Sequence, residues 1–309
     1  MKKNSSIYVA GHKGLIGSAI MRKLKLQGCK NIITRTHKEL DLADKRKVES
    51  FFAKEKPEYV FLAAAKVGGI YANNAYPAEF IYQNLMIQIN VIDLSYKYGV
   101  KKLLFLASSR IYPKNYKPPM KEEHLLTGPI ELTNEAFAVA KLAGIKMCQA
   151  YNRQYRTNFI SVIPANVYGI NDRFDENAHV VSSLIKNFHE AKIKAQEGVT
   201  IWGSGKSKRD FLYVDDIADA CLFLMKNYNS SEIINVGTRV ETSIKELAEL
   251  VRQITGFKGK TIYDTTKPDG NPRRFLDSSK IKALGWEPNI VLNKGLRLTY
   301  NWYKELEKP

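Results

Sequence analysis

Runs of apolar residues alternate with amphipathic stretches along the first half of the chain. Runs typical of buried strands occupy residues 6–10, 31–34, 59–65, 101–108 and 159–163. Near-continuous apolar runs, as opposed to alternating ones, are expected where helices cover both faces of a parallel sheet. The repeated strand–helix order therefore predicts an α/β protein built on a right-handed, doubly wound parallel sheet.

The first apolar run leads directly into a glycine-rich turn and the start of an amphipathic helix. Gly11, Gly14 and Gly17 form the pattern G-x-x-G-x-x-G. Glycines at this spacing permit a tight turn, close approach of the backbone to a pyrophosphate, and close packing of the helix on the sheet. The N–H groups at the helix start would face the phosphates. The stretch predicts a dinucleotide site, although a bare turn remains the alternative at this point.

The second strand ends at a basic segment that bears on the choice of cofactor. An acid at this position would accept hydrogen bonds from the ribose 2′-OH of NAD, whereas Arg35 with Lys13, His37 and Lys38 would neutralise a 2′-phosphate. The sequence therefore favours NADP(H), with a solvated basic loop as the alternative.

Two long helices and a looser C-terminal part complete the pattern. Pro77 opens a helix that is apolar on more than one side, and a second helix is expected from Asn134 and Glu135 to about Arg153. From about residue 170 onward, short strands, helices and turn-rich loops follow. We expect residues 1–169 to form the cofactor-binding domain. Residues 170–309 should form a smaller, mainly substrate-binding α/β domain, interleaved with the last strands of the sheet.

Composition narrows the class of protein. The chain has 309 residues, 44% apolar and 26% charged, and a formal net charge of +17. The lysines are scattered and no nucleic-acid motif accompanies them, so a basic surface serving anionic small ligands is favoured over nucleic-acid binding. No apolar run is long enough to span a bilayer and no signal peptide is evident, so we expect a cytoplasmic protein without a membrane partner. The isolated Cys29, Cys148 and Cys221 suggest neither disulfides nor a metal site.

Several motifs, in order along nearly the whole chain, resemble the GDP-L-fucose synthase family of extended short-chain dehydrogenases/reductases. They lie at residues 10–17, 63–69, 108–114 (SSRIYPK), 126–128, 133–135, 140–146 and 267–270. The resemblance implies a Rossmann sheet, NADP(H) as cofactor and a GDP-4-keto sugar as substrate. The family converts GDP-4-keto-6-deoxy-mannose to GDP-L-fucose by epimerising C3 and C5 and then reducing the C4 ketone. It also implies a homodimer formed through the helices at about 77–97 and 135–153.

The family's reductase centre is a Ser…Tyr-x-x-x-Lys set, which this chain keeps in part. Ser108 and Lys141 match, but Phe137 stands at the tyrosine position. Residues four apart share a helix face, so the lysine would lower the pKa of a phenol from about 10 and help it to protonate a ketone oxygen. Two interpretations stay open: a protein that binds without reducing, or a single-oxygen change, natural or engineered, in an otherwise intact reductase. We favour the second.

The family's epimerase pair is also incomplete. His179 matches the histidine, whereas Arg110 occupies the cysteine position. Arginine is almost always protonated and cannot replace a thiol as a proton carrier at neutral pH. We therefore expect reduction without epimerisation.

The resemblance implies further ligand contacts. For the cofactor these are Leu15, Ile16, Asp41, Leu42, Ala63, Ala64, Ala65, Lys141, Pro164, Asn166 and Val167. For the substrate they are Ser109, Asn166, His179, Val180, Trp202, Arg209 and Lys267. Arg209 as a surface charge and Trp202 as a core residue are the alternatives. We predict an NADPH-dependent C4-ketoreductase of a GDP-linked 6-deoxyhexose or heptose. A bifunctional epimerase/reductase and a binding protein without turnover are the other possibilities.

Overall fold

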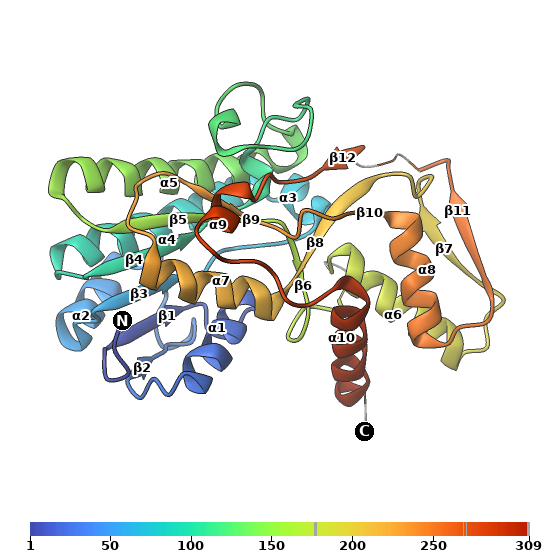
Figure 1. The fold of residues 1–309 in the computed structure, drawn as a ribbon, viewed down its shortest axis with the longest axis horizontal. Helices are drawn as coiled ribbons and strands as arrows, with labels where there is room; N and C mark the ends of the chain where they lie inside the picture. The colour runs from blue at the N-terminus through green and yellow to red at the C-terminus, as the bar shows by residue number, and fades with distance from the viewer. Residues whose placement is uncertain (176–177, 268, 270, 308–309) are drawn as a thin grey trace.

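A six-stranded parallel sheet forms the centre of the larger part of the molecule, which confirms the predicted α/β class (Figure 1). The computed structural model describes residues 1–175, 178–267, 269 and 271–307. In spatial order the strands are β2 (Ile32–Ile33), β1 (Ile7–Ala10), β3 (Tyr59–Leu62), β4 (Lys102–Leu106), β5 (Phe159–Pro164) and β9 (Ile234–Val236). The strand order reverses between β1 and β3, and ligands of such sheets bind at the carboxyl ends of the strands beside that point.

Helices cover both faces of this sheet, as the continuous apolar strands predict. On one face α4 packs between α2 and α5, and on the other α1 packs against α7. Their bounds are α1 (Leu15–Leu26), α2 (Lys45–Glu55), α4 (Pro77–Lys97), α5 (Glu135–Tyr155) and α7 (Val214–Asn227), with the short α3 (Ile70–Ala75) before α4. The strand side chains between these layers are buried, and removal of apolar surface from water is the main force that holds the layers together.

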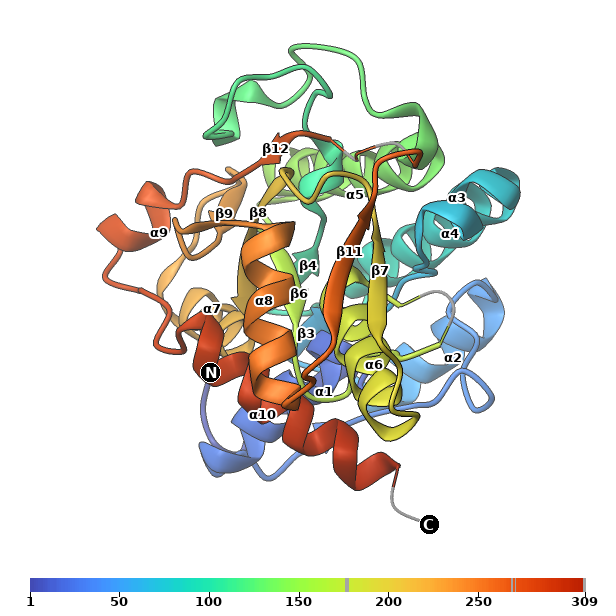
Figure 2. The same cartoon turned by 90° about the vertical axis from the view of Figure 1, so that its right-hand side faces the viewer.

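The second, smaller part lies to the right in Figure 1 and is connected to the first through β6 and β8. β8 pairs with β6, β10 and β12, and β7 pairs with β11. Figure 2 shows β7 and β11 side by side, with α6 and α8 next to them. The strands are β6 (Asn166–Tyr168), β7 (Gly198–Trp202), β8 (Lys208–Tyr213), β10 (Glu241–Ser243), β11 (Lys260–Asp264) and β12 (Arg273–Arg274). The helices are α6 (Val180–Ile193), α8 (Ile244–Thr255), α9 (Ser279–Ala283) and α10 (Leu292–Leu306).

The structure differs from the predicted elements in two ways. The strand β3 ends at Leu62 and does not extend to Ala65, because the backbone leaves the sheet where it meets the glycine-rich turn. The helices α2 and α10 are present in the structure but were not predicted from the sequence. The predicted division at residue 169 stays a prediction. In the part of the chain that the structure describes, no helix combines the length and apolar character needed to cross a bilayer.

Candidate functional site

The glycine-rich turn lies at the reversal of strand order and is closed on both sides by backbone. Gly11 has φ +83°, and a Cβ there would lie 2.7 Å from the Ala64 nitrogen. A Cβ at Gly17 would lie 2.1 Å from the Gly11 oxygen. Any side chain at either position would therefore force the turn apart. The residues predicted to bind the cofactor in this region, Ala63, Ala64, Ala65, Leu15 and Ile16, adjoin this turn.

The start of α1 is open to an anion. Gly14, the residue before the helix, provides no side-chain cap for the first N–H groups. Beside the turn, His12 has a buried Nδ1 atom without a hydrogen-bond partner. Burial lowers the pKa of His12, and the positive charge of Lys13 adds to this. Uncapped helix N–H groups, the tight glycine turn and an unpartnered ring nitrogen together fit the phosphates of a dinucleotide.

Arg35 lies at the end of β2, as predicted, but its guanidinium is already engaged. Its Nη2 atom lies 2.6 Å from Glu55 Oε1 on α2, and its Nη1 atom donates to the Thr34 oxygen at 2.7 Å. The guanidinium also lies over the Phe51 ring, 5.4 Å from its centroid. Asp41 accepts from the Ala43 nitrogen, and the Leu42 oxygen accepts from Asn90, so these two residues are fixed in place. Sequence reasoning missed Glu55 because α2 was not among the predicted elements.

Lys141 and Phe137 meet at the carboxyl end of β4, and Ser108 follows two residues after that strand ends. The Lys141 Nζ atom donates to the Leu106 oxygen at 2.8 Å and lies 4.7 Å from the Phe105 ring centroid and 5.9 Å from that of Phe137. Burial lowers the pKa of Lys141 to about 7. The Ser108 hydroxyl accepts from the Arg110 nitrogen at 3.3 Å, while Ser109 is buried. The helix brings the ammonium to the aromatic ring as the spacing predicts, but that ring has no hydroxyl.

Arg110 extends from η1 (Ser109–Ile111) toward the start of α5. Its Nη1 atom donates to Asn134 Oδ1, and Asn134 is the last residue of η3 (Leu132–Asn134). Burial and the charges of Arg274 and Arg209 lower the pKa of Arg110 to about 10. The pKa of His179 is lowered, mainly by burial. The charge of Asp172 opposes this shift, and the charge of Arg110 adds to it. Arg110 is therefore close to the other candidate side chains.

Arg209 and Arg274 form a pair of like charges on neighbouring strands. They are register partners on the parallel strands β8 and β12, so their side chains leave the sheet on the same face. Arg274 is 8% exposed and its Nε atom has no hydrogen-bond partner. Burial and the charge of Arg274 lower the pKa of Arg209 to about 10. None of Arg110, Arg209 and Arg274 forms an ion pair with a carboxylate among the described residues, so an anion is expected here.

Arg274 is a residue that sequence reasoning missed. A two-residue strand gives no period-2 signal, and its register with β8 cannot be read from sequence. The alternative that Arg209 is a surface charge disagrees with its half-buried position.

Trp202 lies at the end of β7 and is 73% exposed, so the alternative that it is a core residue is wrong. The Lys267 Nζ atom lies 5.7 Å from its ring centroid. An exposed indole with a cation over it offers a stacking surface for a planar base. Pro268 and Gly270 of the KPDG motif lie outside the described residues.

His179 immediately precedes α6, whose first residue, Val180, is exposed. Its Nδ1 atom lies 4.0 Å from Asp172 Oδ1, and Asp172 Oδ2 accepts from the Ser182 hydroxyl at 2.6 Å. Burial raises the pKa of Asp172, which the Ser182 hydroxyl opposes. The carboxylate favours the tautomer with hydrogen on Nδ1, which leaves Nε2 for a ligand.

The remaining predicted contacts lie at the end of β5 and on β6. Pro164 ends β5, and Asn166 and Val167 belong to β6. The Asn166 amide donates to the Asp210 oxygen at 3.0 Å, so it ties β6 to β8.

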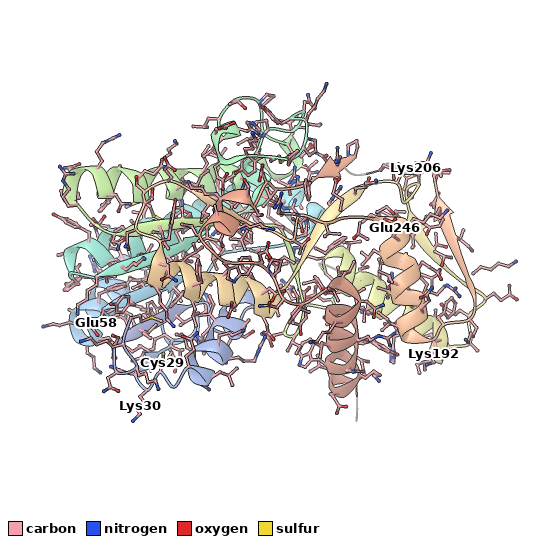
Figure 3. The ribbon with its side chains drawn as sticks, in the orientation of Figure 1. Cys29, Lys30, Glu58, Lys192, Lys206 and Glu246 are labelled. Atoms are coloured by element: carbon pink, nitrogen blue, oxygen red, sulfur yellow. The ribbon has the colours of Figure 1, made fainter. Side chains whose placement is uncertain are left out.

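The cysteines lie away from this cluster. Cys148 and Cys221 are buried inside α5 and α7, and burial raises the pKa of Cys148 to about 12. Figure 3 places Cys29 at the lower left, on the opposite side of the molecule from α6. None of the three thiols can therefore stand in for the one that Arg110 replaces. In the described residues, no group of three or more acidic, histidine or cysteine side chains is arranged to hold a metal ion.

Comparisons with known proteins agree with this geometry. The model of the NAD dependent epimerase/dehydratase family matches residues 7–237. The chain is 60% identical to the putative GDP-L-fucose synthase 2 of Arabidopsis thaliana, over 99% of this chain and 93% of that protein. The solved structure of a GDP-6-OMe-4-keto-L-xylo-heptose reductase from C. jejuni superposes with a TM-score of 0.95, at 40% identity and 99% coverage of both chains. MlghC, a GDP-mannoheptose C4 reductase from Campylobacter jejuni with NADP bound, superposes with a TM-score of 0.90, at 40% identity, covering 98% of this chain and 99% of that one.

Proposed function

We propose a reaction from the premise that this chain belongs to the NAD dependent epimerase/dehydratase family and, within it, to the GDP-L-fucose synthase family. As a member it is an NADP-dependent oxidoreductase of a GDP-linked sugar. The reaction that we propose is reduction of a C4 ketone on that sugar, a 6-deoxyhexose or a heptose, without epimerisation at C3 or C5. The observation that carries the proposal is the buried Lys141, held on the Leu106 oxygen at the strand end that bears Ser108.

NADP(H) fits the site at the β1–β3 reversal. The uncapped start of α1 and the turn at Gly11 and Gly17 would hold the pyrophosphate, and Arg35 with Lys13 would face the 2′-phosphate. Lys141 would hold the nicotinamide ribose. NADPH supplies a hydride when bound. The protein's part is to orient the ketone through Ser108 and to stabilise the charge that develops on its oxygen.

The nucleotide end of the substrate fits the basic side chains of the smaller part. Arg209 and Arg274 lie side by side without a carboxylate partner among the described residues, and two phosphates of a GDP-sugar would neutralise them. Trp202 and Lys267 would contact the guanine, and His179 and Val180 would line the sugar pocket. This arrangement supports a nucleotide sugar over a free sugar.

We predict that the chain binds NADP(H) more tightly than NAD(H), because a guanidinium contact to the 2′-phosphate contributes about 1.5–3 kcal/mol. Arg35→Glu should raise the dissociation constant of NADPH by about 10- to 100-fold and change that of NADH by less than about threefold. Glu55→Gln is the matched variant: it frees Arg35 from its ion pair and should tighten NADPH binding. Fluorescence titration at low salt measures the dissociation constants of NADPH and NADH for all three proteins. Equal constants for NADPH and NADH in the unmodified chain would contradict the assignment.

We propose that the chain is a homodimer formed through α4 and α5. Tyr82, Ile89 and Tyr96 recur at intervals of seven along α4 and are 63%, 42% and 39% exposed. Tyr96 stacks on Tyr155 of α5, with ring centroids 4.1 Å apart. The two helices pack against each other, and a second copy would cover these exposed side chains.

Ile89→Glu is expected to dissociate this dimer. An unpaired carboxylate buried at the interface should raise the dimer dissociation constant at least about tenfold. Leu26→Glu, at an even more exposed leucine on α1, is the control and should stay dimeric. Sedimentation over a concentration series distinguishes the outcomes. A monomer in the unmodified chain, or a dimer unaffected by Ile89→Glu, would refute this interface.

Two other functions remain to be tested. The pairing of His179 with Asp172 favours a bifunctional epimerase/reductase, because that half of the epimerase centre is intact. The missing hydroxyl at Phe137 favours a protein that binds a nucleotide sugar or NADP(H) without turnover. Monitoring NADPH absorbance with GDP-4-keto-6-deoxy-mannose separates the enzymes from the binding protein, and solvent deuterium exchange separates the two enzymes.

A further inference from the structure

The two departures from the family pattern, Phe137 and Arg110, are linked through the start of α5. The Arg110 guanidinium donates to the side chain of Asn134, which stands directly before α5. Phe137 follows three residues later and Lys141 four residues after that. Asn134 stands about one helical turn before Phe137, so the guanidinium is held at the end of α5 that carries the ring without a hydroxyl.

The ammonium group beside this ring is committed elsewhere. Lys141 Nζ is fixed on the Leu106 oxygen and packed against the Phe105 and Phe137 rings. The guanidinium of Arg110, by contrast, has five N–H donors, of which the described hydrogen bonds use one. It can keep Asn134 as a partner and still donate to a ligand.

The surroundings of Arg110 favour an anion or a developing negative charge. It makes no ion pair with a carboxylate of the described residues, and the charges of Arg274 and Arg209 act on it. Glu131 is near Arg274 but is also paired with Lys114 at 3.3 Å. A fixed cation in a partly desolvated site stabilises charge on an oxygen much more strongly than the same cation in water.

We infer that Arg110 is a catalytic residue of this chain, donating a hydrogen bond to the C4 carbonyl oxygen in place of the phenol that Phe137 lacks. The inference rests on the proposed ketone reduction. It identifies Arg110 as the residue that supports the ketone reduction of the unmodified chain, in which Phe137 cannot donate a proton. Arginine at this position thus has two consequences: the thiol is lost, and a charged hydrogen-bond donor to the ketone oxygen is gained.

The reaction balances without deprotonating Arg110. A C–H bond forms at C4 with the two electrons of the hydride from the reduced nicotinamide, and the carbonyl π pair moves to oxygen. Arg110, with Ser108, stabilises the alkoxide. The alkoxide then takes a proton from water, which leaves hydroxide to be neutralised by the solvent buffer, and the guanidinium stays protonated throughout.

A double-mutant cycle with chemical rescue tests this role. With NADPH and GDP-4-keto-6-deoxy-mannose, Arg110→Ala should lower kcat about 10²-fold, the usual effect of removing one such donor, with a smaller change in KM. Millimolar guanidinium chloride should restore at least about a tenth of the lost activity, and equal sodium chloride should restore none. In the Phe137→Tyr background the same substitution should cost less than about threefold, because the phenol then serves the ketone. Arg252→Ala, which removes a guanidinium paired with Glu249 on α8, is the control for both salts.

The outcomes separate a failure of the role of Arg110 from a failure of the proposed function. NADPH binding by fluorescence confirms that Arg110→Ala is folded. An unchanged kcat in Arg110→Ala, equal losses in both backgrounds, or no rescue by guanidinium would overturn the role of Arg110. Turnover by Phe137→Tyr but not by the unmodified chain would overturn it too, while leaving the proposed reduction standing. Absence of turnover in every protein would contradict the proposed function and this inference together.

Discussion

Replacing Phe137 by tyrosine is expected to raise kcat with a GDP-4-keto sugar by about 10²–10⁴-fold, the usual contribution of a positioned general acid. The new hydroxyl would sit on the face of α5 that carries Lys141, whose Nζ atom already lies 5.9 Å from the ring centroid. When protonated, that ammonium lowers the pKa of a neighbouring phenol and so favours proton donation to the ketone oxygen. The rate of NADPH absorbance loss with GDP-4-keto-6-deoxy-mannose measures the gain.

The same substitution should leave binding nearly unchanged, because one oxygen is added at the reacting atom and nothing is removed from the cofactor or nucleotide contacts. Dissociation constants of NADPH and GDP should agree within about twofold between the two forms. Phe223→Tyr, which adds a hydroxyl to a half-buried ring on α7, is the matched control and should give no gain. If Phe137→Tyr reduces no GDP-4-keto sugar faster than the unmodified chain does, the binding-protein interpretation becomes the better one.

The sheet could be predicted from sequence because its signal is local and redundant. Strands covered on both faces are apolar throughout, so β3, β4 and β5 stand out in the sequence without any knowledge of their partners. The glycine turn is equally local: the clash of a Cβ at Gly17 with the Gly11 oxygen involves two residues six apart. Where the backbone leaves the sheet is not local, which explains why β3 was expected to run to Ala65.

Contacts between distant segments account for what sequence reasoning missed. Glu55 on α2 pairs with Arg35, which follows β2. Arg274 lies beside Arg209 because the two-residue strand β12, which has no hydrophobic pattern of its own, pairs with β8. The side chain of Asn134, which holds Arg110, is likewise 24 residues away in the chain. Residue types at these positions are visible in the sequence, but which of them face one another depends on the register of strands and the packing of helices. The roles of the individual site residues remain predictions that mutagenesis can test.

The second large effect is expected in proton exchange at carbon. Epimerisation at C3 and C5 needs one group to remove a proton beside the ketone and another to return one on the opposite face. His179, paired with Asp172, would serve one face, but by the motif resemblance Arg110 stands at the position of the family's thiol. The guanidinium cannot accept a proton at neutral pH. We therefore predict that the natural substrate reaches this protein with its C3 and C5 configuration already set by a separate epimerase.

In D2O without NADPH, the Phe137→Tyr form should incorporate no deuterium at C3 or C5 of GDP-4-keto-6-deoxy-mannose beyond the rate without enzyme. The double variant Phe137→Tyr with Arg110→Cys should exchange about 10²–10⁴-fold faster, because a thiol again stands opposite His179. Adding His179→Asn should abolish that gain, whereas Arg110→Ala should not produce it, since it removes the cation without supplying a proton carrier. Proton NMR of the recovered sugar nucleotide follows each carbon separately. Rapid incorporation at either carbon while Arg110 is present would show that the thiol is dispensable here and would make the bifunctional epimerase/reductase the better description of the chain.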